Sequence, residues 1–117
     1  MGKKKILVVD DDFDDLTSIK SILEKAGYNV VGATNGAQGL DALKEDGFSL
    51  ALIDVKMPTL SGYDLLRILR ERLNHNIPMV YVTIVPRKDV DMDDIDGFIQ
   101  KPFNSVSVLK EIKRVMK

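Results

Sequence analysis

The chain has 117 residues, a length that suits one domain with a substantial core, and we expect a single domain over residues 1–117. A net charge of −1 gives no overall field that would favour nucleic acid or an anionic membrane, and the absence of cysteine excludes disulfides, thiolate catalysis and cysteine-ligated zinc. No apolar run suits a membrane span or a signal peptide, so we expect a cytoplasmic location.

Aliphatic runs alternate with segments whose apolar residues recur at helical spacing. In chain order, the pattern predicts a strand at Lys5–Val9, a helix at Asp14–Ala26, a strand at Asn29–Ala33, a helix at Gly36–Lys44, a strand at Leu50–Ile53, a helix at Gly62–Leu73, a strand at Pro78–Thr83, a strand at Phe98–Gln100 and a helix at Asn104–Met116. In the second helix we expect Ala37, Leu40 and Leu43 to face inward. Aliphatic strands joined by helical crossovers predict an α/β fold with a doubly wound parallel sheet, whose ligand site lies at the carboxyl ends of the strands.

Polar residues stand at those strand ends. Asp10 and Asp11 follow the first strand, and Asp54 follows the third. Thr83 ends the fourth strand, and Lys101 follows the fifth. Because the carboxyl ends of parallel strands meet at one edge of the sheet, we expect these side chains to share one crevice.

Carboxylates placed this close together repel each other unless one keeps its proton or a cation neutralises them. Two or three carboxylates with open positions for water and a phosphate oxygen suit Mg²⁺, with Mn²⁺ as the alternative ion. A carboxylate can also attack phosphorus, while a metal and an ammonium stabilise the charge on the phosphoryl oxygens. The crevice is therefore suited to accepting a phosphoryl group.

Four stretches of the sequence resemble the receiver domain of two-component response regulators. They are Ile6-Leu7-Val8-Val9-Asp10-Asp11, Leu52-Ile53-Asp54-Val55-Lys56-Met57-Pro58 with Ser61-Gly62, Val82-Thr83, and Lys101-Pro102-Phe103. Each stretch is weak alone, but four in this order at strand ends are a specific signal, and they span essentially the whole chain. The resemblance implies a five-stranded, flavodoxin-like sheet of order 2-1-3-4-5.

The resemblance also implies a metal-assisted phosphoacceptor site. Asp54 matches the phosphoacceptor of the family. Asp10 and Asp11 match the acidic pair that holds Mg²⁺, and the backbone carbonyl of Lys56 is expected to complete the metal site. The donor would be a phosphohistidine on a sensor histidine kinase or phosphotransfer protein, and small donors such as acetyl phosphate could also serve.

Three further positions match the groups that respond to phosphorylation. Thr83 matches the hydroxyl that turns toward the phosphoryl group, and Lys101 matches the lysine that pairs with it, followed by a cis peptide bond to Pro102. Phe98 matches the aromatic switch position. The resemblance implies a phosphoacceptor with self-catalysed phosphorylation and dephosphorylation rather than an ordinary enzyme.

Simpler interpretations exist for each of these residues. Asp10 and Asp11 could cap the following helix, which is the role we expect for Asp12. Lys101 could be a solvated lysine, Thr83 an ordinary strand residue and Phe98 part of the core. For the remaining polar residues we expect structural roles only: helix-dipole stabilisation by Asp14 and Asp15, a solvated loop for His75, a solvated acidic loop for Asp89, Asp91, Asp93, Asp94 and Asp96, and a solvated basic face for Lys110, Lys113, Arg114 and Lys117.

The sequence departs from the family pattern in two places. Ile84 follows Thr83 where the family usually has a small residue, so we expect restricted access to the phosphoryl group and slower dephosphorylation than in Ile84→Ala. The segment from Ile84 to Gly97 contains Pro86 and lacks an apolar stripe of helical spacing. It predicts a short or missing fourth helix and a mobile acidic loop, which places standard dimerisation in doubt and favours a monomer or weak dimer.

We therefore expect a stand-alone receiver whose phosphorylation switches contacts with an unknown downstream protein. The alternative is a receiver-like interaction scaffold that is never phosphorylated. A phosphatase with an aspartate nucleophile is disfavoured because it would need a carboxylate two residues after Asp54, where Lys56 stands.

Overall fold

The computed structural model describes residues 3–45, 47–71 and 76–116. The predictions made for His75 and for the last two residues of the helix at Gly62–Leu73 lie outside these ranges. Among the described residues, no helix is long and apolar enough to cross a membrane.

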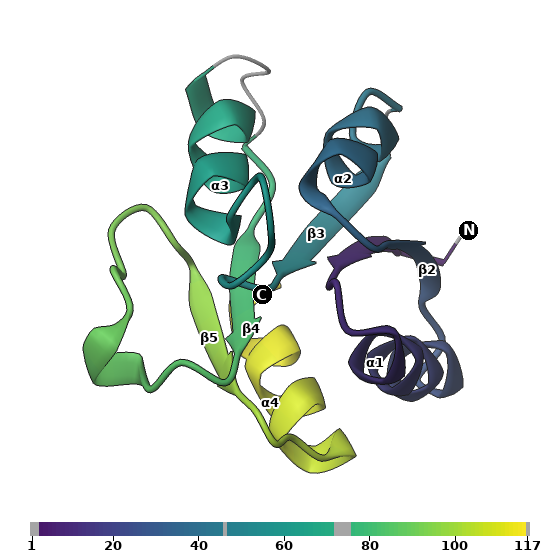
Figure 1. Cartoon of the computed structure of the whole chain (residues 1–117). Coiled ribbons are helices and arrows are strands. Elements are labelled where there is room, and N and C mark those ends of the chain that lie inside the picture. Colours follow the sequence, from purple (N-terminus) through teal and green to yellow (C-terminus); the bar gives the residue numbers. More distant parts are fainter. Residues whose placement is uncertain (1–2, 46, 72–75, 117) are drawn as a thin grey trace.

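Five parallel strands form one sheet in the order β2-β1-β3-β4-β5, which confirms the predicted doubly wound fold (Figure 1). The strands are β1 (Lys5–Val9), β2 (Asn29–Ala33), β3 (Phe48–Ile53), β4 (Met79–Thr83) and β5 (Gly97–Gln100). β4 begins one residue after the predicted start at Pro78, whose ring nitrogen has no hydrogen to donate to a neighbouring strand.

Two helices cover each face of the sheet. α1 (Phe13–Lys25) and α4 (Ser105–Val115) lie on one face, and α2 (Gly36–Ala42) and α3 (Gly62–Glu71) lie on the other (Figure 1). α1, α2 and α4 begin after side chains that accept a backbone hydrogen bond from the first turn, namely those of Asp12, Asn35 and Asn104. These caps satisfy backbone donors that have no partner inside the helix, so the start of each helix is encoded locally.

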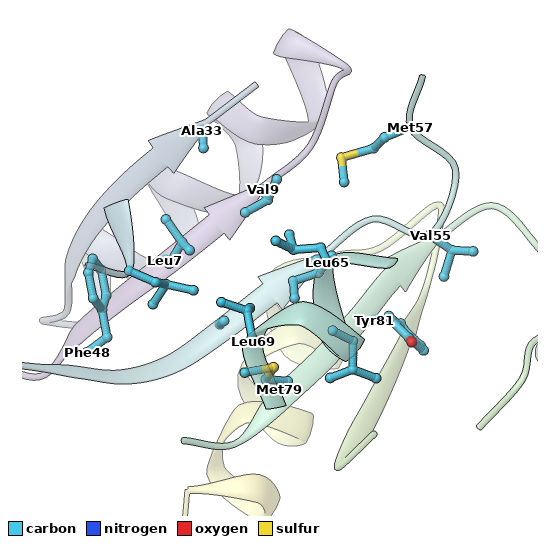
Figure 2. Close-up of a cluster of buried hydrophobic side chains, with 14 of the residues drawn as sticks. Leu7, Val9, Ala33, Phe48, Val55, Met57, Leu65, Leu69, Met79 and Tyr81 are labelled. Atoms are coloured by element: carbon cyan, nitrogen blue, oxygen red, sulfur yellow. The ribbon is translucent and has the colours of Figure 1, made fainter. Parts of the chain in front are cut away.

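The strands are almost wholly aliphatic because both faces of the sheet are buried. Leu7 and Val9 of β1 belong to one buried cluster that includes Leu65 and Leu69 of α3 and extends to Tyr81 of β4 (Figure 2). The alternate strand residues pack on the opposite face against α1 and α4. A strand buried on both sides gains from an apolar residue at every position, which explains the continuous aliphatic runs.

The predicted inward face of α2 was wrong at Ala37, which is exposed. The helix turns Gly36 and Gly39 toward the core instead. A methyl group at Gly39 would lie 2.9 Å from Cγ2 of Val9, closer than carbon atoms normally approach. Gly39 thus lets the α2 backbone come close to β1, and Gly36 lets it come close to the side chain of Leu60 before α3, a packing choice that apolar periodicity does not reveal.

The segment between β4 and β5 contains a single 3₁₀ turn, η1 (Arg87–Asp89), in place of a fourth crossover α-helix (Figure 1). This confirms the prediction of a short or missing helix. The segment still contributes to the core, because Val90 is buried and Met92 and Ile95 pack against the cluster that contains Tyr81.

Asp96 corrects the prediction of a wholly solvated acidic loop. Its carboxylate oxygen Oδ2 accepts a hydrogen bond from the backbone N–H of Met79 at 2.8 Å and pairs with Arg70 at 2.8 Å. Arg70 also donates to the carbonyl of Ile77 at 3.0 Å. All five aspartates of the loop are exposed to solvent, but Asp96 also connects the loop to the start of β4 through these contacts.

We expect Asp96→Ala to lower the free energy of unfolding by about 1–3 kcal/mol, because the Met79 N–H loses its acceptor and the ion pair with Arg70 is lost. Urea denaturation of both proteins measures the change. Asp93→Ala is the matched control, since Asp93 is an exposed carboxylate on the same loop, and we expect it to stay within about 0.5 kcal/mol of wild type. Equal effects of the two substitutions would contradict this role for Asp96.

Candidate functional site

The polar side chains singled out in the sequence meet at the carboxyl edge of the sheet. The backbone N–H of Asp10 donates to the carbonyl of Ala33 at 3.0 Å, and that of Asp54 donates to the carbonyl of Val9 at 2.9 Å. The sheet ladder thus extends to both aspartates, so they leave the neighbouring strands β1 and β3 side by side. Their positions depend on strand register and not on a flexible loop.

Asp10, Asp11 and Asp54 form an acidic cluster in which one carboxylate oxygen of each lies within 4.8 Å of the other two. Asp10 and Asp54 are only 1% and 6% exposed, whereas Asp11 is open to solvent. The cluster thus combines two buried carboxylates with a third that solvent can reach. Three carboxylates arranged in this way offer oxygen ligands of the type that Mg²⁺ or Mn²⁺ prefers.

One buried atom of this cluster has incomplete hydrogen bonding. Asp10 Oδ1 accepts a hydrogen bond from the backbone N–H of Asp12 at 2.9 Å. Asp10 Oδ2 lies 2.8 Å from Lys101 Nζ, but within the described ranges it is the one buried side-chain oxygen or nitrogen that makes no hydrogen bond of acceptable geometry. A buried carboxylate oxygen without a well-aligned donor is costly, and coordination to a metal ion would satisfy it, because an ion needs no hydrogen directed at the oxygen. The donor set therefore fits a divalent metal.

Lys101 places its ammonium group among carboxylates. Nζ lies 2.8 Å from Asp10 Oδ2, 2.8 Å from Asp15 Oδ2 and 3.2 Å from Asp54 Oδ2. The side chain is 6% exposed, so the interpretation as a solvated surface lysine was wrong. Lys101 N–H donates to the carbonyl of Thr83 at 2.8 Å, and the peptide bond to Pro102 is cis, as the resemblance implied.

The pKa of Asp10 and that of Lys101 are both raised in this crevice. Burial raises the pKa of the Asp10 carboxyl to about 6, against the lowering effect of the nearby Lys101 ammonium and of the hydrogen bond from the Asp12 N–H, and the charge of Asp54 adds to the rise. At Lys101, hydrogen bonds to Asp10 and Asp15 outweigh burial and raise the pKa of the ammonium above its usual range. Lys101 therefore stays charged, while burial, more than the charge of Asp54, makes the Asp10 carboxyl harder to ionise.

Thr83 and Lys56 lie next to the cluster in different environments. Thr83 is completely buried, and its hydroxyl oxygen accepts a hydrogen bond from the backbone N–H of Val85 at 3.2 Å. Lys56 is exposed, and its backbone N–H donates to Asp54 Oδ1 at 3.3 Å. The metal-binding role of the Lys56 carbonyl stays a prediction. Ile84 is 64% exposed, so its side chain lies at the surface beside the buried Thr83.

Phe98 is half-buried on β5 and packs at the edge of the core cluster that contains Tyr81. The guanidinium group of Arg87 lies over its ring, 5.8 Å from the ring centroid. The Phe98 backbone N–H donates to Glu111 of α4 at 2.8 Å. Phe98 is thus in contact with both η1 and α4, and its role as a switch stays a prediction.

Gly62, at the start of α3, lets the helix approach the loop that follows Asp54. Its N–H donates to the carbonyl of Val55 at 2.9 Å, and a methyl group at this position would lie 2.8 Å from the Val55 Cα. The same methyl group would collide with the Asp54 carbonyl oxygen. Because backbone atoms cannot move aside as a flexible side chain can, the position requires glycine and holds the residues after Asp54 in place.

Asp15 was assigned to helix-dipole stabilisation alone, and its contact with Lys101 was missed. Its neighbour Asp12 has the predicted capping role, since Asp12 Oδ1 accepts from the Asp15 N–H at 3.0 Å. The sequence carried one available signal. Asp15 lies in the first turn of a helix that begins at the carboxyl edge of the sheet, within reach of the same crevice.

Comparisons with known proteins agree with this geometry. Residues 6–113 match the family described as the response regulator receiver domain. The chain is 34% identical over 120 residues to the transcriptional regulatory protein CpxR of Escherichia coli, an alignment that covers 97% of this chain and 49% of that protein. The chain thus spans about half the length of CpxR and of the transcriptional regulatory protein YkoG of Bacillus subtilis, whereas it covers 97% of the response regulator receiver protein CpdR of Brucella abortus.

Solved structures show the same fold. The chemotaxis protein CheY4 of Vibrio cholerae superposes with a TM-score of 0.89 at 28% identity, covering 97% of this chain and 99% of that one. The response regulator protein TrrA of Thermotoga maritima, solved in complex with Mg²⁺-BeF, superposes with a TM-score of 0.86 at 26% identity, covering 96% of this chain and 98% of that one.

Proposed function

Because this chain belongs to the response regulator receiver domain family of two-component systems, we propose that Asp54 accepts a phosphoryl group in a Mg²⁺-dependent reaction and that the phosphorylated form switches contacts with other proteins. The observation that carries the proposal is the contact of Lys101 Nζ with Asp54 Oδ2 at 3.2 Å beside the cluster of Asp10, Asp11 and Asp54. A nucleophile, a cation and a metal-binding donor set are thus in one crevice.

In the proposed reaction, a carboxylate oxygen of Asp54 attacks the phosphorus of the donor. A new P–O bond forms while the P–N bond of a phosphohistidine breaks, and the leaving imidazole keeps the electron pair and takes up a proton. Lys101 stays protonated and pairs with a phosphoryl oxygen. Asp10 and Asp11, with Asp54 and the Lys56 carbonyl, would hold Mg²⁺, which supplies positive charge to the phosphoryl oxygens when bound. The Mg²⁺-BeF complex of TrrA supports this assignment.

The proposed donor is a sensor histidine kinase or phosphotransfer protein. Two large apolar side chains are exposed on the first turns of helices that start beside the crevice: Phe13 of α1 is 70% exposed, and Val106 of α4 is 74% exposed. α1 and α4 lie on the same face of the sheet, so both side chains are available to a protein that approaches Asp54 (Figure 1). Exposed apolar groups near a site support contact with a protein surface.

The proposed switch runs from Thr83 to Phe98. A phosphoryl group adds a charge of about −1.5 to −2 near neutral pH and three acceptor oxygens. The Thr83 hydroxyl only accepts in its contact with the Val85 N–H, so its hydrogen can be donated to one of these oxygens. A turn of the Thr83 side chain toward the phosphoryl group would disturb that contact and thereby the segment from Val85 to η1. Arg87 of η1 covers the Phe98 ring, so a shift of this segment would change the surface around Phe98. The downstream partner would recognise that surface.

Phosphorylation with acetyl phosphate and Mg²⁺ tests the proposal. We expect intact-protein mass spectrometry to show the mass of one added phosphoryl group, and a metal chelator to abolish it. Failure to modify the protein with acetyl phosphate, together with failure to bind beryllofluoride in Mg²⁺, would instead favour the alternative of a scaffold that is never phosphorylated.

A further inference from the structure

Lys101 is held by one carboxylate that lies outside the acidic cluster. Asp10 and Asp54 contact its ammonium group, and both belong to the cluster that fits a metal ion. Asp15 contacts it at 2.8 Å from the first turn of α1 and is not part of that cluster. All three carboxylates thus lie within ion-pair distance of the ammonium group, and each one that stays there competes by its charge with a phosphoryl oxygen for Lys101.

The three carboxylates differ in what a bound metal would do to them. A divalent ion in the cluster would take up the negative charge of Asp10 and Asp54, which weakens their hold on the ammonium. It would leave Asp15 as a full negative charge within hydrogen-bond distance of Lys101. Asp15 is therefore the carboxylate that competes with an incoming phosphoryl group for the ammonium after the metal has bound.

Asp15 also has room to release Lys101. Its side chain is 34% exposed, whereas that of Asp10 is 1% exposed and that of Asp54 is 7% exposed. It borders a groove of about 500 Å³ between α1 and Pro102-Phe103. The Asp15 carboxylate can thus turn into solvent without leaving a buried charge unpaired, which the two buried aspartates cannot do.

We propose that Asp15 is a positioning residue that holds Lys101 in the resting state and competes with the phosphoryl oxygens for its ammonium group. This inference rests on the proposed function, since it concerns the affinity of the same site for a phosphoryl group. Asp15 touches neither the reacting oxygen nor the metal. While Asp15 holds the ammonium group of Lys101, a phosphoryl group must displace it in order to bind. Removal of the Asp15 carboxylate should therefore strengthen phosphoryl binding at the site.

Titration with beryllofluoride at saturating Mg²⁺, followed by ¹H–¹⁵N NMR, measures this competition without any turnover. We expect Asp15→Asn to bind about threefold to tenfold more tightly than wild type, because it removes a charge-assisted contact and a nearby negative charge. Asp15→Glu keeps the charge and should lie closer to wild type than Asp15→Asn does. Titration with Mg²⁺ alone should change by no more than about twofold in each variant, because Asp15 is outside the metal-binding set.

Asp14→Asn is the matched control. Asp14 is an exposed carboxylate in the same first turn of α1, so its replacement changes the net charge and the helix dipole in the same way. We expect its beryllofluoride affinity to stay within about twofold of wild type. Unchanged or weaker binding by Asp15→Asn would overturn the inference, as would an equal gain in Asp14→Asn. If the wild-type protein binds no beryllofluoride, the proposed function itself is overturned. If the wild-type protein binds it and Asp15→Asn does not bind it more tightly, only the inference about Asp15 is overturned.

Discussion

Asp54→Asn should abolish Mg²⁺-dependent phosphorylation by acetyl phosphate while leaving the protein folded. The amide has nearly the shape of the carboxylate but carries no negative charge and is a poor nucleophile toward phosphorus. It also contributes a weaker metal ligand to the cluster with Asp10 and Asp11. Intact-protein mass spectrometry after incubation with acetyl phosphate measures the loss, and a retained mass increase would show that another residue is the acceptor.

The same substitution is expected to stabilise the metal-free protein. Burial is the main cause of the raised pKa of Asp10, and the charge of Asp54 adds to it, so removal of that charge lessens repulsion between two buried carboxylates that share Lys101. We expect the free energy of unfolding in the presence of a chelator to rise by about 1 kcal/mol near pH 7. Asp41→Asn, a change at an exposed carboxylate of α2, is the control and should be nearly neutral. If Asp54→Asn is less stable than wild type, the loss of the contact between Lys101 and Asp54 costs more free energy than the relief of repulsion between Asp10 and Asp54 contributes.

Mg²⁺ binding should weaken as the pH falls through about 6. Burial raises the pKa of the Asp10 carboxyl from its ordinary value of 3.8 to about 6, so below that pH a metal ion must displace a proton from Asp10. We expect the apparent Kd for Mg²⁺ to be about tenfold higher at pH 5 than at pH 7. Titrations of Mg²⁺ followed by NMR at several pH values give this dependence directly.

The control for this pH dependence is Asp10→Asn, which should bind Mg²⁺ more weakly at pH 7 and should show a much flatter profile between pH 5 and pH 7. The raised pKa of Asp10 also predicts how the stability of the metal-free protein changes with pH. Between pH 3.8 and about 6, the native state holds a proton on Asp10 that the unfolded state has lost. The stability contributed by protonated Asp10 is therefore fully present below pH 3.8 and is lost as the pH rises through about 6. A Kd that does not change with pH would contradict the proposed part of Asp10 in metal binding.

Features encoded by neighbouring residues were predictable from the sequence. The strands could be recognised because burial on both faces demands an apolar residue at each position, as at Ile6 to Val9 of β1. The start of α4 could be placed at Asn104 because a capping side chain acts within one turn. The short η1 could be anticipated because the residues around Pro86 have no apolar stripe for a crossover helix to bury.

Features that depend on close approach between distant segments were not predictable. α2 turns Gly36 and Gly39 inward because the space beside Leu60 and beside Val9, respectively, excludes a larger residue. Asp96 was expected to be solvated, but the chain returns it to the start of β4, where the Met79 N–H needs an acceptor. Neither requirement can be read from the residues next to Gly39 or Asp96, since the constraint comes from another part of the chain.

The candidate site also has features that the sequence predicts and features that depend on tertiary contacts. The sequence by itself determined which groups gather at the carboxyl edge of the sheet, because Asp10, Asp54 and Lys101 stand directly at strand ends, and parallel strands bring those ends together. Only the tertiary structure decided which carboxylates Lys101 contacts and added Asp15 to them. Such contacts depend on side-chain direction and on the packing of α1 against the sheet, and a difference of a few ångströms separates an ion pair from a solvated charge.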